Sequence, residues 1–322
     1  MTIPTISLGA PTDEVSAALR DACTTVGFFY LKDHGITDRL LREVLRQSAV
    51  LFALPDDQKR TLSDPTLERG HTRFGEETLD PAHQPTRGDT KEGFYIREEA
   101  SAMDVSKLQG PNVWPTPTNC QLTDDQCRAF RKTMETYLSD ATKVCLRLVR
   151  CFALAVGSDP CVFDRHFTKP ETTLRLLRYS TEASDQKAGL YACGAHSDYG
   201  MITLLLTDEN PGLQVQSNDG NWMGIPPKRG AFVVNIGDMF ERWTNGRFKS
   251  TQHRVITPKG ADQRYSVPFF FGPNFNALVE CLESCQDSEH PPRYPPITAG
   301  QHLLDMYKKT HADFDYLGEK EV

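Results

Sequence analysis

The hydrophobic period of the chain changes after residue 170, and this change constrains the fold more than any other feature. Thr173 to Ser180 alternates between apolar and polar residues, and Met201 to Leu206 is an unbroken apolar run. The first pattern is typical of a half-buried strand and the second of a fully buried one. Further strands are predicted at 213–215, 231–236, 252–257 and 264–271. Because tight turns and not helices separate these segments, they predict an antiparallel sandwich or barrel.

The first half of the chain is predicted to be mainly helical, with helices ending near Thr25 and Phe52 and a short strand at 28–31. Thr123 opens a capping box, and the apolar stripe that follows predicts one long helix ending at Gly157. Residues 63–122 show weak periodicity, and Arg69 to Tyr95 is interpreted as a lid or pocket wall. A solvated surface excursion is the alternative for that segment.

The composition excludes several classes of function. The 322 residues include 43 acidic and 36 basic ones, which gives a net charge of -7. Nucleic-acid binding and docking on anionic membranes both need a basic face, so neither is expected. No apolar run is long enough to span a bilayer, and no secretory signal is recognised. We expect a cytoplasmic monomer that acts on a small molecule, with its nine cysteines reduced.

Two histidines and an aspartate in the β region form a candidate metal site. His196 and Asp198 are two residues apart, so on a strand their side chains would point to one face. His253 begins a later predicted strand. Two histidines and one carboxylate form the facial triad of non-haem iron(II) sites, which leaves other coordination positions open. From these residues alone, two unrelated histidines remain the alternative.

An arginine and a serine follow the second histidine at short spacing. Arg264 and Ser266 would also share a strand face. Arginine offers a planar fork of donors to a carboxylate, and serine adds a hydroxyl, so the pair predicts a site for an organic acid. A strand-edge arginine in a surface ion pair is the alternative.

Taken together, these motifs resemble the iron(II)- and 2-oxoglutarate-dependent dioxygenases, specifically the isopenicillin N synthase-like, plant-type branch. The resemblance extends from residue 3 to about residue 312. Further matching segments are 3–8, 27–30, 33–36, 54–59, 235–238, 243–246 and 249–253.

The resemblance implies a mainly β protein with α-helices, whose core is a double-stranded β-helix, or jelly roll, wrapped by N-terminal helices. One domain would span residues 1–322. It would comprise an N-terminal α/β region with lid-like loops at 1–122, a long support helix at 123–157, a jelly-roll core at 172–275 and a C-terminal helix at 298–312.

The resemblance also implies cofactors and site residues. The cofactors would be Fe(II), 2-oxoglutarate and O2, with succinate and CO2 released while a substrate C–H bond is hydroxylated, desaturated or used for ring closure. Leu177 stands where many relatives carry asparagine, so one cosubstrate contact is expected to be missing. His34 lies in a family motif and is expected to be structural. The implied metal ligands are His196, Asp198 and His253, and the implied 2-oxoglutarate-binding residues are Arg264, Ser266 and Tyr179.

Substrate-binding residues are predicted less directly. Strand alternation places Arg175 on the face of Tyr179, so Arg175 is expected to pair with a carboxylate or phenolate of an anionic metabolite. An exposed arginine at a strand start is the alternative. Phe270 resembles a pocket-lining aromatic of the family, and Lys91 and Tyr95 are candidates for a pocket wall. The other histidines are expected on the surface or in packing: His71, His83, His166, His290, His302 and His311.

Two other functions stay open at this point. An iron oxidase that uses no 2-oxoglutarate would share the triad, although Arg264 and Ser266 favour the cosubstrate. A non-catalytic ligand-binding protein could share the fold, although an intact triad argues against it. A zinc hydrolase with the same three ligands is a further, less favoured reading.

Overall fold

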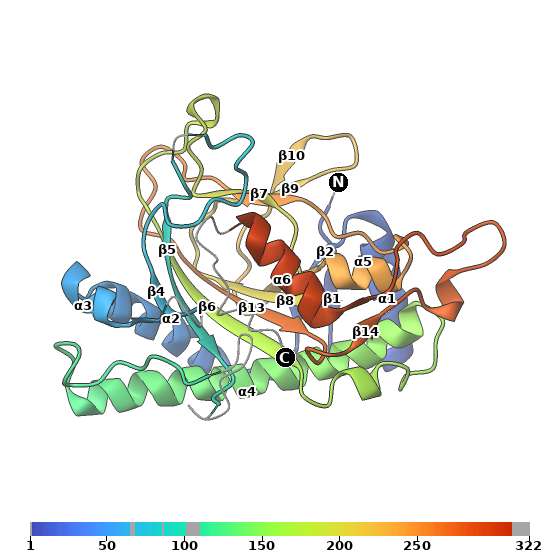
Figure 1. Cartoon of the computed structure of the whole chain (residues 1–322), viewed down its shortest axis with the longest axis horizontal. Coiled ribbons are helices and arrows are strands. Elements are labelled where there is room, and N and C mark those ends of the chain that lie inside the picture. The colour runs from blue at the N-terminus through green and yellow to red at the C-terminus, as the bar shows by residue number, and fades with distance from the viewer. Residues whose placement is uncertain (1, 65–67, 86, 101–109, 311–322) are drawn as a thin grey trace, which may run out of the picture.

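Two β-sheets form the centre of the molecule in the computed structural model, which describes residues 2–64, 68–85, 87–100 and 110–310 (Figure 1). Among these residues every strand pair is antiparallel except β1 with β2. In spatial order the larger sheet consists of β1 (Thr5–Ser7), β2 (Phe28–Lys32), β11 (Phe232–Ile236), β8 (Ile202–Thr207), β13 (Tyr265–Gly272), β6 (Glu171–Tyr179), β5 (Lys91–Arg97), β4 (Arg69–Thr72) and β3 (Ser63–Asp64). The smaller sheet consists of β10 (Trp222–Gly224), β9 (Leu213–Gln216), β12 (His253–Val255) and β7 (Cys193–His196).

Helices surround these sheets, and β14 (Leu278–Val279) pairs with β15 (Ile297–Thr298) outside them. Short 3-10 turns lie at Asp164–His166, Gln186–Ala188 and Glu283–Cys285. No described helix combines the length and apolar character that a bilayer crossing requires. All nine cysteines carry free thiols. The helices are α1 (Thr12–Thr25), α2 (Asp38–Phe52), α3 (Asp56–Thr61), α4 (Asp124–Ala155), α5 (Asp238–Trp243) and α6 (Ala299–Thr310).

The predicted jelly roll with N-terminal helices is confirmed, but the larger sheet extends beyond residues 172–275. β1 and β2 add to one edge, and β3, β4 and β5 add to the other. The segment from Arg69 to Tyr95 is therefore not an irregular lid throughout, because both of its ends are sheet strands. Only the loop between them is irregular. Sequence periodicity missed β4 and β5 because β5 is buried on both faces and carries charged residues there.

The long helix α4 lies along the outer face of the larger sheet (Figure 1). Its capping box is present: the Thr123 hydroxyl accepts from the Gln126 N–H at 3.3 Å, and Gln126 Oε1 accepts from the Thr123 N–H at 2.8 Å. Phe130 and Leu148 belong to the apolar stripe that packs in the same core cluster as β6, β8 and β13. The helix thus covers the outer face of these central strands.

Residues of β6 alternate between two cores, as strand geometry requires. Leu174 and Leu176 pack in the larger core with α4. Leu177 and Tyr179 pack in a smaller cluster with Val255 of the second sheet. The inner face of the larger sheet is therefore directed at the smaller sheet, and any site between them is built from every second residue.

Replacing Thr123 with alanine removes the acceptor of the capping box. We expect the free energy of unfolding to fall by about 1 kcal/mol, the usual cost of losing such a cap. Urea denaturation at equilibrium measures it. Thr136→Ala is the control, since the Thr136 hydroxyl only bonds the Lys132 carbonyl on the exposed face of α4. Equal losses in the two variants would contradict a capping role.

Candidate active site

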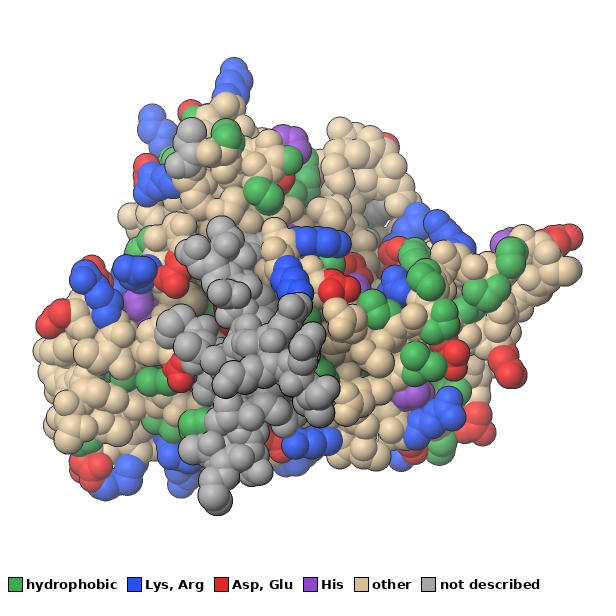
Figure 2. Space-filling model, viewed as in Figure 1, with side chains coloured by type: hydrophobic (Ala, Val, Ile, Leu, Met, Phe, Trp, Pro, Cys, Tyr) green, Lys and Arg blue, Asp and Glu red, His purple; other side chains and the backbone are tan. Residues whose placement is uncertain are grey.

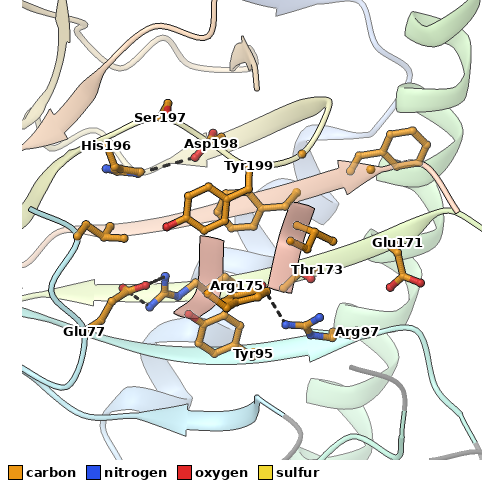
Figure 3. A pocket seen from close by; sticks show the side chains of 17 residues that line it. Glu77, Tyr95, Arg97, Glu171, Thr173, Arg175, His196, Ser197, Asp198 and Tyr199 are labelled. Carbon is orange, nitrogen blue, oxygen red and sulfur yellow. Dashed lines mark hydrogen bonds and ion pairs between the residues drawn. The ribbon is translucent and has the colours of Figure 1, made fainter. Parts of the chain in front are cut away.

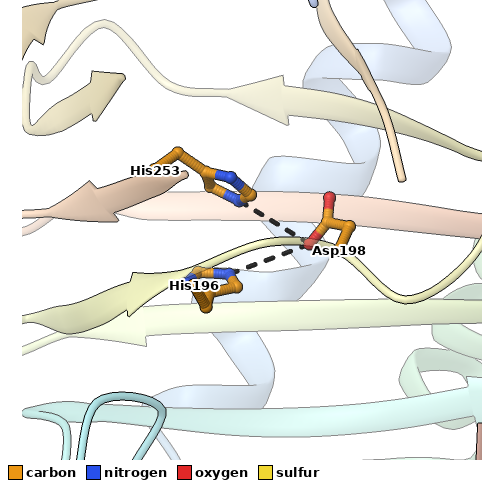
Figure 4. A group of neighbouring side chains, drawn as sticks. All are labelled: His196, Asp198 and His253. Atoms are coloured by element: carbon orange, nitrogen blue, oxygen red, sulfur yellow. Dashed lines mark ion pairs between the residues drawn. The ribbon is translucent and has the colours of Figure 1, made fainter. Parts of the chain in front are cut away.

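The three predicted metal ligands meet where the smaller sheet faces the larger one (Figure 4). His196 is the last residue of β7, and His253, the first of β12, is its direct cross-strand partner. Asp198 lies just beyond β7, so it reaches the histidines from a loop and not from the strand that its spacing predicted. Asp198 Oδ1 is 3.8 Å from His196 Nε2 and 3.6 Å from His253 Nε2. Since metal bonds to such ligands are about 2.0–2.2 Å long, one ion can reach all three.

Backbone carbonyls orient both imidazole rings. His196 Nδ1 donates to the Gly194 carbonyl at 2.8 Å, and His253 Nδ1 donates to the Thr251 carbonyl at 3.1 Å. A hydrogen on Nδ1 leaves Nε2 of each neutral ring with its lone pair free, which is the form that binds a metal. Burial is the main cause that lowers the pKa of His253, to about 4, so this ring is neutral at physiological pH.

The carboxylate of Asp198 is held by its other oxygen. Oδ2 accepts hydrogen bonds from Thr203 Oγ1 and from Asn235 Nδ2, each at 2.6 Å. Burial raises the pKa of Asp198, but the two histidines and these hydrogen bonds outweigh it and hold the pKa below its usual value. An ionised carboxylate with Oδ1 directed at two Nε2 atoms is a donor set that fits a divalent cation. Among the described residues this is the group that could hold a metal.

The residues predicted to bind an organic acid lie together between the sheets. The Tyr179 hydroxyl is 3.0 Å from Ser266 Oγ, and the Arg264 guanidinium lies over the Tyr179 ring at 4.5 Å. Arg264 donates through Nε to the Asn210 carbonyl at 3.3 Å. Its buried Nη1 has no hydrogen-bond partner among the described residues. A buried cationic donor without an acceptor is costly, so this atom fits a ligand carboxylate.

Leu177 is the cross-strand neighbour of Ser266. Its side chain is buried and packs in the smaller apolar cluster. The amide that many relatives are expected to carry here is thus replaced by a hydrocarbon surface beside Ser266 and Tyr179.

A cavity that is partly open to solvent lies beside the triad, and Figure 3 shows the side chains that line it. His196 and Asp198 lie on one side of it, and Arg175, Glu77 and Tyr95 lie on the other. Phe270, predicted as a pocket aromatic, is among the lining residues. Aromatic and aliphatic side chains make up much of the wall: Leu79, Tyr95, Tyr199, Phe270, Phe271, Leu303 and Tyr307.

Arg175 faces this cavity but is not free to pair with an anion. Its Nη1 and Nη2 donate to the two carboxylate oxygens of Glu77 at 3.2 and 2.7 Å, and its guanidinium lies 4.3 Å over the Tyr95 ring. Lys91, predicted as a wall residue, is buried beneath the pair and contacts Glu77 at 2.8 Å and Asp89. The residues that line the cavity do not include Lys91. Arg175 thus lies at the cavity as predicted, but Glu77 already supplies its counter-charge, and its pairing with a substrate anion stays a prediction.

Sequence reasoning missed several residues of the site. Glu77 lies in an irregular loop, where no period indicates direction. Arg97 follows Tyr95 at the strand spacing of two, and this alternation could have placed it on the cavity face. It donates to the Tyr307 hydroxyl at 3.2 Å, and Tyr307 comes from the distant helix α6. Thr203, which donates to Asp198, likewise stands in no sequence pattern that would indicate this contact.

The other histidines that the structure describes do not belong to the metal-ligand group. His34 is buried, accepts from the Ile36 N–H at 3.2 Å and packs on Phe232, in agreement with a structural role. His71 is buried and bonds Glu92 at 2.8 Å, so it is part of a polar cluster and not simple packing. His311 lies outside the described residues.

Two family models match the chain. Residues 170–273 match the 2OG-Fe(II) oxygenase superfamily, and residues 3–117 match the N-terminal region described as "non-haem dioxygenase in morphine synthesis N-terminal". The first match covers the jelly-roll strands that carry the triad. The second covers the strands and helices that complete the larger sheet.

Curated relatives and solved structures agree with these matches. A 2-oxoglutarate-Fe(II) type oxidoreductase of Emericella nidulans is 33% identical, with 94% of this chain and 86% of the relative covered. The structure of a full-length Neurospora crassa protein in complex with alpha-KG and thymine has a TM-score of 0.81 at 30% identity, with coverage of 95% and 96%. JOX2 in complex with 2OG, Fe and JA has a TM-score of 0.79 at 26% identity, with coverage of 95% and 85%. The chain therefore belongs to the plant-type, isopenicillin N synthase-like 2-oxoglutarate-dependent dioxygenases, oxidoreductases that use Fe(II) and 2-oxoglutarate.

Proposed function

We propose that this dioxygenase oxidises a C–H bond of a small, ring-bearing molecule, with hydroxylation, desaturation or ring closure as the outcome. The observation that carries the proposal is the position of the aromatic cavity, which is lined by two residues of the triad, His196 and Asp198. A molecule held there would present its C–H bond to the metal side of the site. The Neurospora crassa relative, at 30% identity, was solved with thymine, a small ring compound, which supports this substrate class.

His196, Asp198 and His253 would hold Fe(II) through Nε2, Oδ1 and Nε2. When bound, Fe(II) with 2-oxoglutarate and O2 supplies the oxidising chemistry, with succinate and CO2 as coproducts. The protein contributes ligand orientation through the Gly194 and Thr251 carbonyls, and it contributes the cavity that selects which C–H bond lies close.

Arg264 would bind the distal carboxylate of 2-oxoglutarate, with Ser266 and Tyr179 donating from their hydroxyls. The unpartnered Nη1 of Arg264 supports this role over the alternative of an iron oxidase without 2-oxoglutarate. An oxidase without 2-oxoglutarate would have no ligand carboxylate to pair with the buried guanidinium of Arg264. The intact triad likewise disfavours a non-catalytic binding protein.

The anionic substrate expected from Arg175 is not favoured by this cavity. An anion would have to displace Glu77, and separating a buried ion pair costs about 3–5 kcal/mol. The wall offers aromatic surface, and its Arg175–Glu77 ion pair leaves no charge unpaired. Such a wall suits a molecule that binds mainly through its ring.

Arg264→Ala should strongly weaken 2-oxoglutarate binding while leaving metal binding intact. Removing one partner of a buried charge pair costs about 2–5 kcal/mol, so 2-oxoglutarate affinity should fall by more than about thirtyfold. The weak visible absorption band of the iron–2-oxoglutarate chelate, titrated without oxygen, measures it. Arg247→Ala, the same change at an exposed arginine that bonds Ser284, is the control. Bound iron without any band in the wild type would instead support the oxidase.

Thr203→Val should weaken iron binding without altering any proposed ligand. The change removes only the hydroxyl that donates to Asp198, and losing such an orienting partner typically lowers metal affinity by about 10–100-fold. Anaerobic calorimetry with Fe(II) measures the affinity. The matched control is Thr172→Val, because the buried Thr172 hydroxyl has no hydrogen-bond partner among the described residues. Unchanged iron affinity in Thr203→Val would refute the orienting role.

A further inference from the structure

Arg175 and Glu77 line one wall of the cavity and belong to a buried cluster of four charged side chains, which Lys91 and Asp89 complete beneath them. We propose that this cluster makes the cavity selective for an uncharged, planar substrate that carries carbonyl or amide groups, and that it rejects carboxylates and cations of the same shape. The inference rests on the proposed function and names the substrate class of that site.

The cluster is balanced in charge. Two cations, Arg175 and Lys91, face two carboxylates, Glu77 and Asp89, and Glu77 bridges both cations at 2.7 and 2.8 Å. All four side chains are buried, so water screens them weakly. A fifth charge of either sign would have no counter-charge here, and an unpaired charge in such a place is costly.

The cluster is also held in place, so Glu77 cannot be exchanged cheaply for a ligand carboxylate. Asp89 accepts from the Gln84 amide at 3.0 Å and from the Gly194 N–H at 2.8 Å, which fixes the partner of Lys91. The Tyr95 ring supports the Arg175 guanidinium from one side. Gly93 leaves the space for it, since a Cβ at that position would lie 3.2 Å from Arg175 Nε.

The cavity lining has the same balance of positive and negative charges when the metal-site residues His196 and Asp198 are left out. Arg97 and Arg175 supply two positive charges, and Glu77 and Glu171 supply two negative ones. Apart from the metal site, the side chains of the wall thus carry no excess charge of one sign that would pair with an ionic substrate.

Two arginines that line the cavity each keep one buried donor without an acceptor. Nε of Arg175 and Nε of Arg97 have no hydrogen-bond partner among the described residues, although both side chains are more than nine-tenths buried. Carbonyl oxygens of an uncharged ligand can accept from such donors without adding charge. Tyr95, Tyr199 and Phe270 supply aromatic faces for a planar ring.

Three probes of nearly the same shape test the proposal: benzamide, benzoate and benzamidine, which carry charges of zero, minus one and plus one. Binding is measured by calorimetry without oxygen, on protein loaded with Fe(II) and 2-oxoglutarate and on metal-free protein. We expect wild type to bind benzamide at least about tenfold more tightly than either ion, a difference of about 1.4 kcal/mol. A preference for benzoate or benzamidine, or no binding of any probe, would overturn the proposal.

The variant Glu77→Gln removes one negative charge at nearly constant shape. It should shift selectivity toward benzoate by at least about tenfold, because Arg175 loses its counter-charge. Glu76→Gln is the matched control, since Glu76 is adjacent in sequence, bonds Arg73 and does not line this cavity. An equal shift in both variants would refute a local charge effect. The wild-type order stands as a test even if Glu77→Gln does not fold.

The same experiment separates this inference from the proposed function. Iron and 2-oxoglutarate affinities are measured beside the probes, and Glu77→Gln should leave the 2-oxoglutarate affinity unchanged. Loss of cofactor binding in wild type would refute the proposed function, whereas normal cofactor binding with benzoate preferred would refute only the substrate class.

Discussion

Both the fold and the site depend on the larger sheet having two different faces, one packed against α4 and the other directed at the site. Alternate residues of β6 point in opposite directions, so Leu174 and Leu176 pack against α4 while Arg175 and Tyr179 face inward. The same alternation in β5 directs Tyr95 inward, beside Arg175 as its cross-strand neighbour on β6. Because α4 covers the outer face of these strands, their register cannot slip by one residue without exposing the core. The positions of Arg175, Tyr179 and Tyr95 are therefore fixed by packing on the opposite face.

Charge within the site is distributed in two distinct ways. Around the triad and Arg264, polar atoms are buried with bonding capacity left over, as at Nη1 of Arg264. Such atoms stabilise a bound ion or acid and are costly while they stay unpaired. Around Arg175 the charges instead neutralise one another, because Glu77 forms ion pairs with both Arg175 and Lys91. The metal ion and 2-oxoglutarate would therefore find unpaired groups of opposite charge, whereas the charged groups of the substrate region are already paired.

The face drawn in Figure 2 carries acidic and basic side chains interspersed, in keeping with a protein whose chemistry lies in an interior site.

The helix α6 connects a late segment of the chain with the cavity. Tyr307 accepts a hydrogen bond from Arg97 of β5 and packs edge-on against Tyr199, which follows Asp198 directly. Figure 1 shows α6 crossing in front of the sheets. One wall of the cavity is therefore built from a helix that lies far along the chain from the first histidine of the triad.

The sequence alone was sufficient for the elements and motifs that depend on local pattern. The capping box at Thr123 and the apolar stripe of α4 were predictable, because helix ends and faces follow from nearby residues. The strands after residue 170 and the grouping of His196, Asp198 and His253 were predictable too, the latter through the order of motifs that resembles a family. Local pattern was insufficient for β4 and β5, whose buried charges hide the strand period.

Only the tertiary structure shows how the charges of the cavity are paired. Arg175 could be placed on the inner face from strand alternation, but its partner Glu77 comes from a loop 98 residues earlier in the chain. No local pattern relates the two, because their contact arises when β4, β5 and β6 bring distant segments together. The oxidising chemistry could be read from the sequence, since it depends on a few ligands in a recognisable order. The selectivity of the cavity depends on long-range pairing of buried charges, and such pairing exists only once the chain has folded.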